Sequence, residues 1–300
     1  MSDDIEPLPL DSQSEHRHPW NFQIAAVVVT VVGSAIGFII LFVLSNGGIW
    51  SLSGTGNSIF ATVPNGQYPI GVTDINSPSS MAPPGVNALS GYKRAYVSSF
   101  SGSELPTGWF VFTGVPGGNP DGQFGASHVV VSDGLLHLNT WRDPMYGNKW
   151  VTGGLCQCGL ARTNGAYFVR SRNTGAGANE AEVLWPKSNI WPPEIDFNET
   201  GSSAISTSST VHFGAQNNIV QLHLNIDMTK WHTWGVVWTA NSITYVVDGK
   251  QWGQIAVAYE IPNVPMTLDF EQRTSCKPVR DCPSGPVSML VDWVAEYAPT

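Results

Sequence analysis

Charged side chains are scarce in this chain of 300 residues. Asp, Glu, Lys and Arg make up only 12% of it, and the formal net charge is -9. No cluster of Lys and Arg occurs anywhere in the sequence. Nucleic acids and anionic lipid surfaces are therefore poor candidates for partners, because both are bound through basic patches. A neutral polymer remains compatible with this composition.

Amphipathic helical patterns are also missing. Outside one segment near the N-terminus, no apolar run has the 3.6-residue period of a helix. The 31 glycines and 21 prolines indicate many turns. The hydrophobic fraction of 42% is too high for a disordered chain. A helical bundle is excluded, and 300 residues are enough for one large domain with its own core.

One long uncharged run stands out, from Ile24 to Leu44. As a helix it would span about 30 Å, the thickness of the hydrocarbon core of a bilayer. A cleaved signal peptide is the alternative. However, the run is longer than a usual signal core, an acidic segment precedes it, and no small-residue cleavage site follows Leu44. The sequence predicts a transmembrane anchor.

The position of basic residues gives an orientation. Arg17 lies just before the run, and the next Lys or Arg is Lys93. The positive-inside rule then places the N-terminus in the cytoplasm and the rest outside the cell, as a single-pass protein of the cell membrane. The expected organisation is a cytoplasmic tail over 1–22, an anchor over 23–45, a Gly/Ser/Pro-rich linker over 46–91 and a folded domain over 92–300.

The segment after Tyr92 reads as many short strands. The runs 129–131 and 135–138 flank a turn containing Asp133-Gly134, and 243–247 is followed by Asp248-Gly249. Asp-Gly between apolar runs predicts a hairpin. Many short strands over about 200 residues favour an all-β, two-sheet sandwich of the jelly-roll type.

Only four cysteines are present, all in this domain: Cys156, Cys158, Cys276 and Cys282. An even number in an outward-facing domain predicts disulfides, since zinc motifs rarely have these spacings. Three pairings are possible, and a direct bond between Cys156 and Cys158 is awkward if both lie in one extended strand. The spacing does not choose among the pairings.

The sharpest feature is the segment 191–199, Trp-Pro-Pro-Glu-Ile-Asp-Phe-Asn-Glu. In a regular strand Glu194, Asp196 and Asn198 share one face, and Glu199 points away. A one-residue bulge between Asp196 and Glu199 would return Glu199 to the face of the other two acids. Three acids on one face repel each other, which raises the pKa of at least one of them and suits a carboxylate nucleophile paired with a protonated acid.

Two simpler interpretations compete with catalysis. The segment could be an exposed acidic strand or a calcium-binding loop. Such a strand rarely has Ile and Phe between its acids, and calcium loops carry more Gly, Asn and Asp in a polar setting. No cofactor and no metal are expected; a structural calcium is possible but nothing in the sequence indicates it.

The motif Glu-Ile-Asp-Phe-Asn-Glu resembles the E-x-D-x-x-E signature of glycoside hydrolase family 16, the laminarinase and lichenase family. Its two-residue spacing before the second Glu is similar to the bulged, laminarinase-like branch. The resemblance covers nearly all of residues 92–298 and implies a concanavalin-like β-jelly roll. Other segments that resemble the family are Trp109 with the following Pro-Gly-Gly-Asn-Pro, 165–170, 184–186, 231–238 and 292–297.

The resemblance implies roles for the acids. Glu194 matches the nucleophile, Asp196 the assisting acid and Glu199 the general acid/base of a retaining, endo-acting hydrolase. The implied substrate is a polysaccharide, with β-1,3- or mixed-linkage glucan as the expectation. The alternatives are a transglycosylase that remodels envelope glycans with the same residues, and a sugar-binding module without turnover.

Four further residues are expected to bind the substrate. Trp185 and Trp191 flank the motif and either stack on sugar rings or pack in the core, as most of the 12 tryptophans would. His212 alternates with apolar residues on the next expected strand and would face the acids. Gln272, at the end of the run 266–272, would reach a sugar hydroxyl.

Overall fold

The computed structural model describes residues 68–274, 276 and 282–300. Among these residues no helix is both long and apolar enough to cross a membrane. The expected anchor over 23–45, the tail before it and the first part of the linker lie outside the described residues. The described part consists of strands with three short 3-10 turns, η1 (Ala126–His128), η2 (Pro144–Tyr146) and η3 (Ala258–Glu260).

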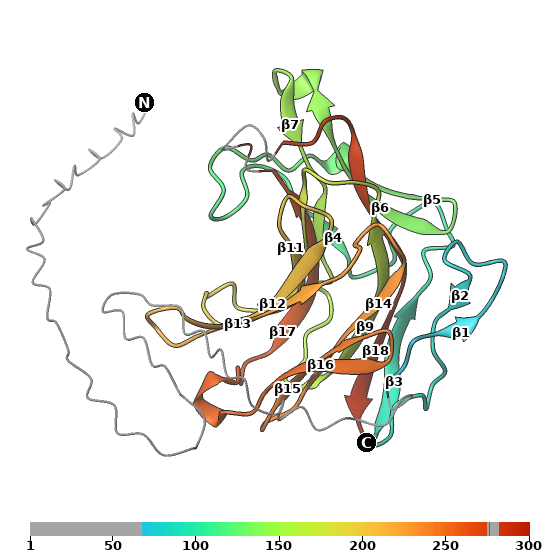
Figure 1. Ribbon diagram of the computed structural model, residues 1–300, viewed down its shortest axis with the longest axis vertical. Helices are drawn as coiled ribbons and strands as arrows, with labels where there is room; N and C mark the ends of the chain where they lie inside the picture. The colour runs from blue at the N-terminus through green and yellow to red at the C-terminus, as the bar shows by residue number, and fades with distance from the viewer. Residues whose placement is uncertain (1–67, 275, 277–281) are drawn as a thin grey trace, which may run out of the picture. The chain divides into compact units, whose positions relative to one another are not determined.

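Two antiparallel sheets form the two layers seen in Figure 1. One has seven strands in the order β13-β12-β11-β10-β17-β8-β4. Its strands are β4 (Phe110–Val111), β8 (Gly154–Cys156), β10 (Asn179–Pro186), β11 (Glu194–Thr200), β12 (Ser206–Phe213), β13 (Asn218–Asn225) and β17 (Met266–Arg273).

The second sheet has nine strands and the order β16-β15-β14-β9-β18-β6-β5, with β3 paired to β18 and β7 to β6. Its strands are β3 (Tyr92–Ser98), β5 (Val129–Ser132), β6 (Leu135–Asp143), β7 (Lys149–Val151), β9 (Gly165–Asn173), β14 (His232–Trp238), β15 (Ile243–Val247), β16 (Lys250–Ile255) and β18 (Val287–Pro299). The all-β sandwich predicted from the sequence is confirmed.

The turn chemistry explains two of the hairpins. Asp133 and Gly134 join β5 to β6 with φ of 55° and 73°, and Asp248 and Gly249 join β15 to β16 with φ of 47° and 76°. Positive φ at both central residues is the type I′ geometry that Asp-Gly supplies at low cost. Both predicted hairpins are confirmed.

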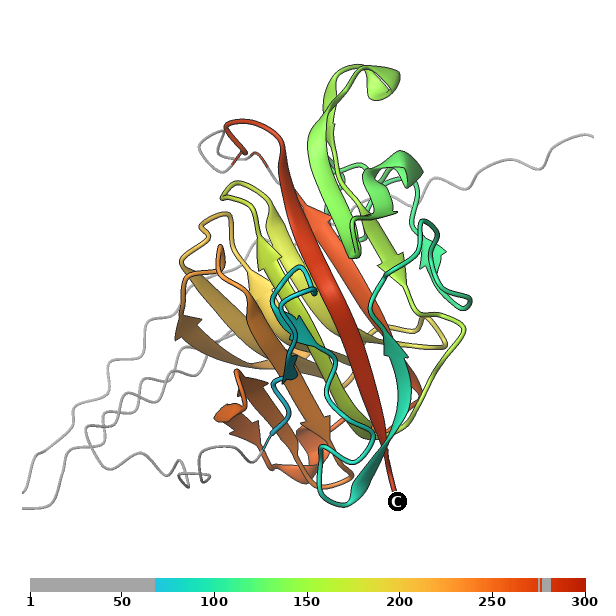
Figure 2. The same ribbon diagram turned by 90° about the vertical axis from the view of Figure 1, so that its right-hand side faces the viewer.

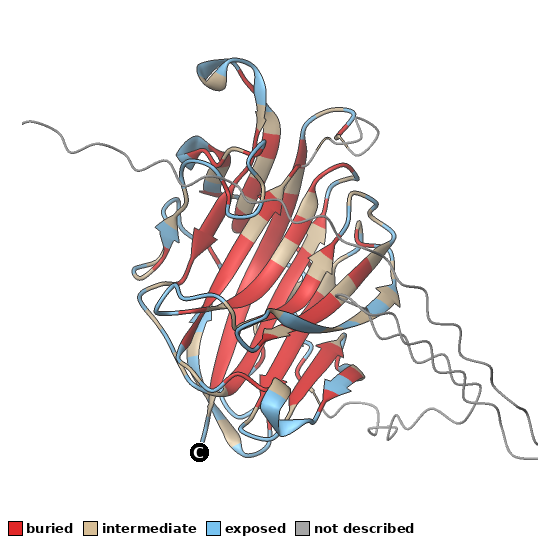
Figure 3. Ribbon diagram, turned by 90° about the vertical axis from the view of Figure 1, so that its left-hand side faces the viewer, coloured by how far each residue is buried: buried red, intermediate tan, exposed pale blue. Residues whose placement is uncertain are grey.

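The main core lies between the sheets. Alternate residues of the seven-stranded sheet, such as Leu184, Ile195 and Val211, pack against Trp234 and Tyr245 of the other sheet. The central strands are coloured as buried in Figure 3, and exposure increases toward the loops. One side of each strand is therefore committed to the core, which leaves the other side of β10, β11 and β12 for polar groups.

Residues 68–91 correct the expected linker. They include β1 (Val72–Thr73) and β2 (Met81–Ala82), and Leu89 is buried on the outer face of the nine-stranded sheet. The Trp293 indole donates to the Met81 carbonyl at 2.9 Å, and the Ser77 hydroxyl donates to Asp292 at 2.6 Å. Figure 2 shows this segment beside β18 on the outer face of the sheet. Glycines and prolines here shape a covering layer instead of a free spacer.

Both cysteine pairs are local. Cys156 bonds to Cys158, and Cys276 bonds to Cys282. A direct bond between cysteines two residues apart is awkward within one extended strand. However, β8 ends at Cys156 and the chain turns at Cys158, so the Cα atoms approach to 5.1 Å.

Candidate active site

A bulge in β11 determines which side chains face outward. Asp196 pairs with Thr210 and Glu199 with Ser208 on β12, so three residues of β11 advance against two of β12. The pairing with β10 has the same extra residue in β11, between the partners of Glu182 and Val183. The predicted bulge between Asp196 and Glu199 is confirmed. It brings Glu199 to the outer face of the sheet, where it interacts electrostatically with Asp196.

Glu194 is held by the chain just before it. The Trp191 indole Nε1–H donates to Glu194 Oε2 at 2.7 Å. Burial, and then the neighbouring Asp196 carboxyl, raise the pKa of Glu194 to about 8, although the Trp191 N–H and His212 oppose this by favouring the anion. The side chain retains 14% exposure, so the carboxyl is largely but not fully shielded from solvent.

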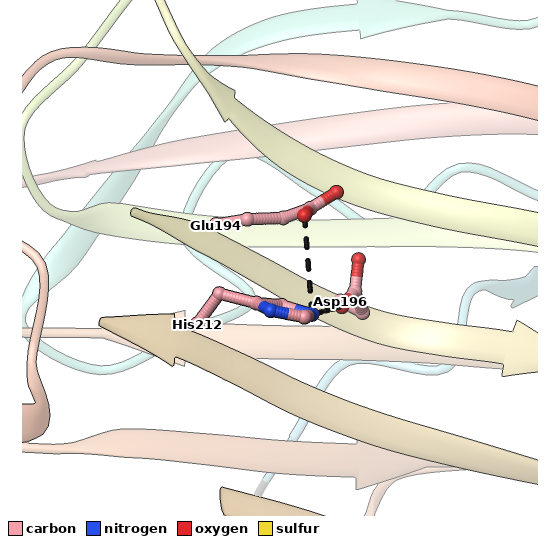
Figure 4. Close-up of side chains that lie close together, drawn as sticks. All are labelled: Glu194, Asp196 and His212. Carbon is pink, nitrogen blue, oxygen red and sulfur yellow. Dashed lines mark ion pairs between the residues drawn. The ribbon is translucent and has the colours of Figure 1, made fainter. Parts of the chain in front are cut away.

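His212 lies opposite the acids on β12, in register with Glu194. Figure 4 shows the three side chains close together, with His212 Nε2 3.4 Å from Asp196 Oδ2 and 3.9 Å from Glu194 Oε2. Burial alone would lower the pKa of His212. The hydrogen bond and charge of Asp196, together with Asn217 and Glu194, outweigh burial and raise this pKa to about 9. A positive imidazolium therefore faces two acids at neutral pH.

Glu199 has a different environment. Burial and the Asp196 charge raise the pKa of Glu199 to about 7, while Arg273 and His212 act to lower it and Glu271 to raise it. No hydrogen-bond donor among the described residues is bound to its carboxyl. A carboxyl with a pKa near 7 is matched to proton transfer at neutral pH.

The predicted tryptophans lie beside this cluster. The ring centroid of Trp191 is 5.5 Å from that of His212, and the side chain is 41% exposed. Trp185 is half-buried and shares one face of β10 with Val183 and Ala181, which lie in register with Asp196 and Glu199 of β11. Its indole donates to Asn189 at 2.8 Å. The structure thus brings both tryptophans and His212 to the outer face.

Gln272 is a correction. It is 1% exposed and points between the sheets. Its amide lies 2.9 Å from Thr140 Oγ1, 2.8 Å from the Leu138 carbonyl oxygen and 2.9 Å from the Met289 nitrogen, all in the nine-stranded sheet. The expected contact with a sugar is incompatible with this placement. Gln272 is in phase with Met266, Leu268 and Phe270, which are core residues.

The other phase of β17 carries polar residues that the sequence analysis missed. Asp269 lies in the row of Val183 and Glu271 in the row of Ala181, so one strand, β10, separates them from the acids of β11. Glu271 forms an ion pair with Arg273, and burial raises the pKa of Asp269. The alternation of apolar and polar residues along 266–273 is visible in the sequence. It places Asp269 and Glu271 on one face of the strand and Gln272 on the other.

The same cluster has the composition of a small cation site. One ligand atom from each of Glu194, Asp196 and His212 lies within 4.8 Å of the others. An imidazole with two carboxylates suits zinc better than calcium. These are also the groups that acid/base chemistry would use, so a bound metal and a free nucleophile exclude each other.

Comparison with known proteins agrees with this geometry. The family model of glycosyl hydrolases family 16 matches residues 124–274, half of the chain and all of the strands described above from β5 to β17. The chain belongs to this family of glycosidases. Endo-1,3-1,4-beta-glycanase EglC of Rhizobium meliloti is 27% identical over 145 residues, which are 46% of this chain. The match spans only 31% of that relative.

Solved structures share the fold. The laminarinase from Rhodothermus marinus has a TM-score of 0.63 and 18% identity, covering 70% of this chain and 98% of that one. The catalytic domain of an endo-1,3-beta-glucanase from Thermotoga petrophila gives 0.60 and 15%, with the same coverage. A Bacteroides ovatus protein of a mixed-linkage glucan locus gives 0.58 and 19%, over 67% of this chain and 99% of that one.

Proposed function

We propose that this protein is a retaining, endo-acting β-glycoside hydrolase with Glu194 as nucleophile and Glu199 as general acid/base. The observation that carries the proposal is the β11 bulge, because it puts Glu199 on the same face as Glu194 and Asp196. Two carboxyls on one face, one ionised and one protonated, are what glycoside hydrolysis requires.

The hydrogen-bond donors support this division of roles. Both Glu194 and Glu199 have raised pKa values, so the values alone do not assign them. The Trp191 N–H and the His212 imidazolium stabilise negative charge on Glu194. Glu199 has no such donor among the described residues. Its pKa of about 7 lies below the value of about 8 for Glu194, so the donors, and not the pKa values, support this assignment.

In the first step a Glu194 carboxylate oxygen attacks the anomeric carbon while the Glu199 carboxyl gives its proton to the departing glycosidic oxygen. The C–O bond to the leaving sugar breaks and a glycosyl ester of Glu194 forms. Asp196 hydrogen-bonds Glu194 and shares the positive charge of His212, so it adjusts the charge of the nucleophile.

In the second step the ionised Glu199 takes a proton from water. The hydroxide oxygen attacks the anomeric carbon, the ester bond breaks, and Glu194 is released as a carboxylate. Two displacements retain the β configuration. Trp185 and Trp191 offer flat apolar surfaces beside the acids, which suit the C–H faces of sugar rings.

A β-1,3- or mixed-linkage glucan is the proposed substrate. It is supported by the 1,3-1,4 specificity in the name of the Rhizobium relative and by the laminarinases and mixed-linkage glucanases that share the fold.

The test uses the full chain in detergent with laminarin, lichenan, agarose and carrageenan. We expect new reducing ends from laminarin or lichenan and β-anomer as the first product in proton NMR. Activity on agarose or carrageenan alone would overturn the substrate, and α-anomer appearing first would overturn retention. Sugar binding without new reducing ends would indicate a binding module, and products longer than an input oligosaccharide would indicate transglycosylation.

We further propose that the uncharged run Ile24–Leu44 anchors the protein in the cell membrane with the folded domain outside. Its length and lack of charge support this proposal. The full-length protein expressed in bacteria should stay in the membrane fraction after a carbonate wash. Recovery of a free product that begins near residue 46 would show that the run is a cleaved signal.

A further inference from the structure

Two carboxyls lie inside the sandwich, directly behind the acids of the outer face. Glu180 and Glu182 on β10 are both 0% exposed. Glu182 accepts a hydrogen bond from the Ser171 hydroxyl of the opposite sheet. The Oε2 atom of each carboxyl has no hydrogen-bond partner among the described residues. Burial of such groups is costly, so the bonds that they do make call for a physical explanation.

The bulge of β11 directs Asn198 toward Glu180. Phe197 and Asn198 are consecutive and both fully buried, because the extra residue of a bulge breaks the alternation of the strand. Phe197 packs in the core, whereas the Asn198 Nδ2–H donates to Glu180 Oε1 at 2.9 Å. The Asn198 amide therefore fills the position that the bulge creates, and Glu180 is its acceptor.

A third strand closes this chain of hydrogen bonds. The Thr207 hydroxyl on β12 donates to Asn198 Oδ1 at 2.7 Å. The bonds Glu180–Asn198–Thr207 thus connect β10, β11 and β12 at the level of the bulge. On the same side of the sheet, the Ser209 hydroxyl donates to the carbonyl of Phe197 at 2.9 Å. Side chains thereby replace ladder bonds that the bulge disrupts.

The next residue in the chain is Glu199. A shift of Asn198 is passed to Glu199 through a single rigid peptide unit, and no hydrogen-bond donor of the described residues holds the Glu199 carboxyl in place. Its direction is consequently determined by the backbone of the bulge. A displacement of about 1 Å in a reacting group can reduce a rate by about 100-fold.

We infer that Glu180, Asn198 and Thr207 are positioning residues that fix the bulge from inside the sandwich and thereby aim Glu199 at the glycosidic oxygen. This inference rests on the proposed function, in which Glu199 donates the proton. None of the three touches the outer face, so they act only through the backbone of β11 and not on the substrate.

The test compares two values of kcat/KM for each variant of the full chain. One substrate is laminarin, or the glycan of the panel that the wild type cleaves. Its leaving sugar needs a proton from Glu199. The other is a 2,4-dinitrophenyl β-oligoglucoside, whose leaving group needs no proton. Loss of folded protein lowers both kcat/KM values equally. Their ratio therefore reports the position of the Glu199 carboxyl and not the stability of the protein.

Thr207→Val has the same shape as threonine but no hydroxyl, and we expect it to lower the ratio of glycan to aryl substrate by about tenfold. Thr207→Ser keeps the hydroxyl and should keep the wild-type ratio. Thr140→Val is the matched control, because it removes a buried hydroxyl bonded to Gln272 between the same two sheets but away from the bulge. It should lower the melting temperature and leave the ratio unchanged.

Glu180→Ala should lower the ratio of glycan to aryl substrate at least as much as Thr207→Val does. Glu180→Gln retains the acceptor oxygen and should keep the wild-type ratio. If Glu180→Ala does not fold, the threonine variants decide the question alone. Equal ratios in wild type, Thr207→Val and Thr140→Val would overturn the inference. Failure of the proposed function is distinguishable, because then Glu199→Ala itself would leave the ratio unchanged.

Discussion

The two faces of β10 and β11 carry carboxyls with very different partners. On the outer face Glu194 and Glu199 lie near the cationic side chains of His212 and Arg273. On the inner face Glu182 accepts a hydrogen bond from the neutral Ser171 hydroxyl, and Glu180 accepts one from the neutral Asn198 amide. Burial is the largest cause of a raised pKa in both places.

The difference shows what makes a buried acid useful. Nearby cations on the outer face keep the charged and neutral forms close in free energy at neutral pH, which permits proton transfer. Inside, without a cation, burial raises the pKa of Glu180 to about 8, the same value as for Glu194, and raises the pKa of Glu182 as well. Solvent access and neighbouring groups therefore separate the two faces: Glu180 and Glu182 are fully buried, whereas Glu194 is partly exposed beside His212.

The largest expected effect comes from the same substitution made on each face. Glu194→Gln removes the nucleophile and should lower kcat for every glycan substrate by about three orders of magnitude or more. Glu182→Gln makes the same chemical change on the inner face of the sheet. Its kcat should stay within about threefold of the wild-type value. Reducing-end assays on both variants measure this contrast, and similar losses in the two would remove the functional distinction between the faces.

Glu199→Ala should fail differently from Glu194→Gln. Cleavage of the glycan should fall by about 100-fold or more, whereas the dinitrophenyl glycoside should still form the covalent intermediate, since its leaving group needs no proton. Added azide should then release a β-glycosyl azide, detectable by mass spectrometry and proton NMR. An α-azide, or no azide product at all, would argue against a Glu194 ester.

Stability should depend on pH through the inner face. The raised pKa of Glu182 means that the folded protein keeps its proton while the unfolded chain loses it above about pH 4.5. This contribution to stability is complete below that pH and decreases as pH rises toward the folded-state pKa. Glutamine does not titrate, so Glu182→Gln should raise the melting temperature by several degrees at pH 8 and little at pH 4. Calorimetry at both values tests this, and an equal change at the two would contradict it.

A smaller loss of activity is expected when the hydrogen bond that stabilises the Glu194 carboxylate is removed. Trp191→Phe keeps an aromatic ring but removes the N–H that donates to Glu194. A hydrogen bond to a charged group contributes about 1.5–3 kcal/mol, so kcat/KM should fall by about tenfold or more at acidic pH. Because the N–H lowers the pKa of Glu194, its loss should move the acidic limb of the kcat/KM profile to higher pH by about one unit. An unmoved limb with only KM raised would mean that Trp191 serves in stacking alone.

The smallest effect concerns Gln272, which the structure places on the inner side. Gln272→Met removes its bonds to the opposite sheet and should cost about 1–3 kcal/mol of stability without changing KM. Urea unfolding and steady-state kinetics provide the two measurements. A raised KM with unchanged stability would return Gln272 to the substrate-binding side.

Several features were predictable because they depend on neighbours in sequence. Asp-Gly turns predicted two hairpins, and the succession of many short strands predicted the sandwich. The bulge followed from three acids that a regular strand could not place together. Gln272 was assigned to the wrong face because its residue type was given more weight than the phase of the strand, which pairs it with Phe270 and not with Glu271.

Other features depended on contacts between distant segments. Residues 68–91 read as a spacer because Gly, Pro and Ser are common there, yet Leu89 and the Met81 carbonyl pack on β18, about 200 residues away. No local pattern reveals such a partner. The link from Glu180 to Asn198 was equally hidden, because it arises only after β10 and β11 pair with a one-residue shift.

The sequence by itself determined the all-β class, the turns and the acids of the E-x-D-x-x-E segment, since these depend on residue type and spacing along a strand. Only the tertiary structure decided which face each acid occupies and what charge lies beside it. Sheet pairing sets His212 against Asp196 and buries Glu180 behind Glu199. The pKa of a carboxyl responds to burial and to charges within a few ångströms, and these distances exist only in the folded chain.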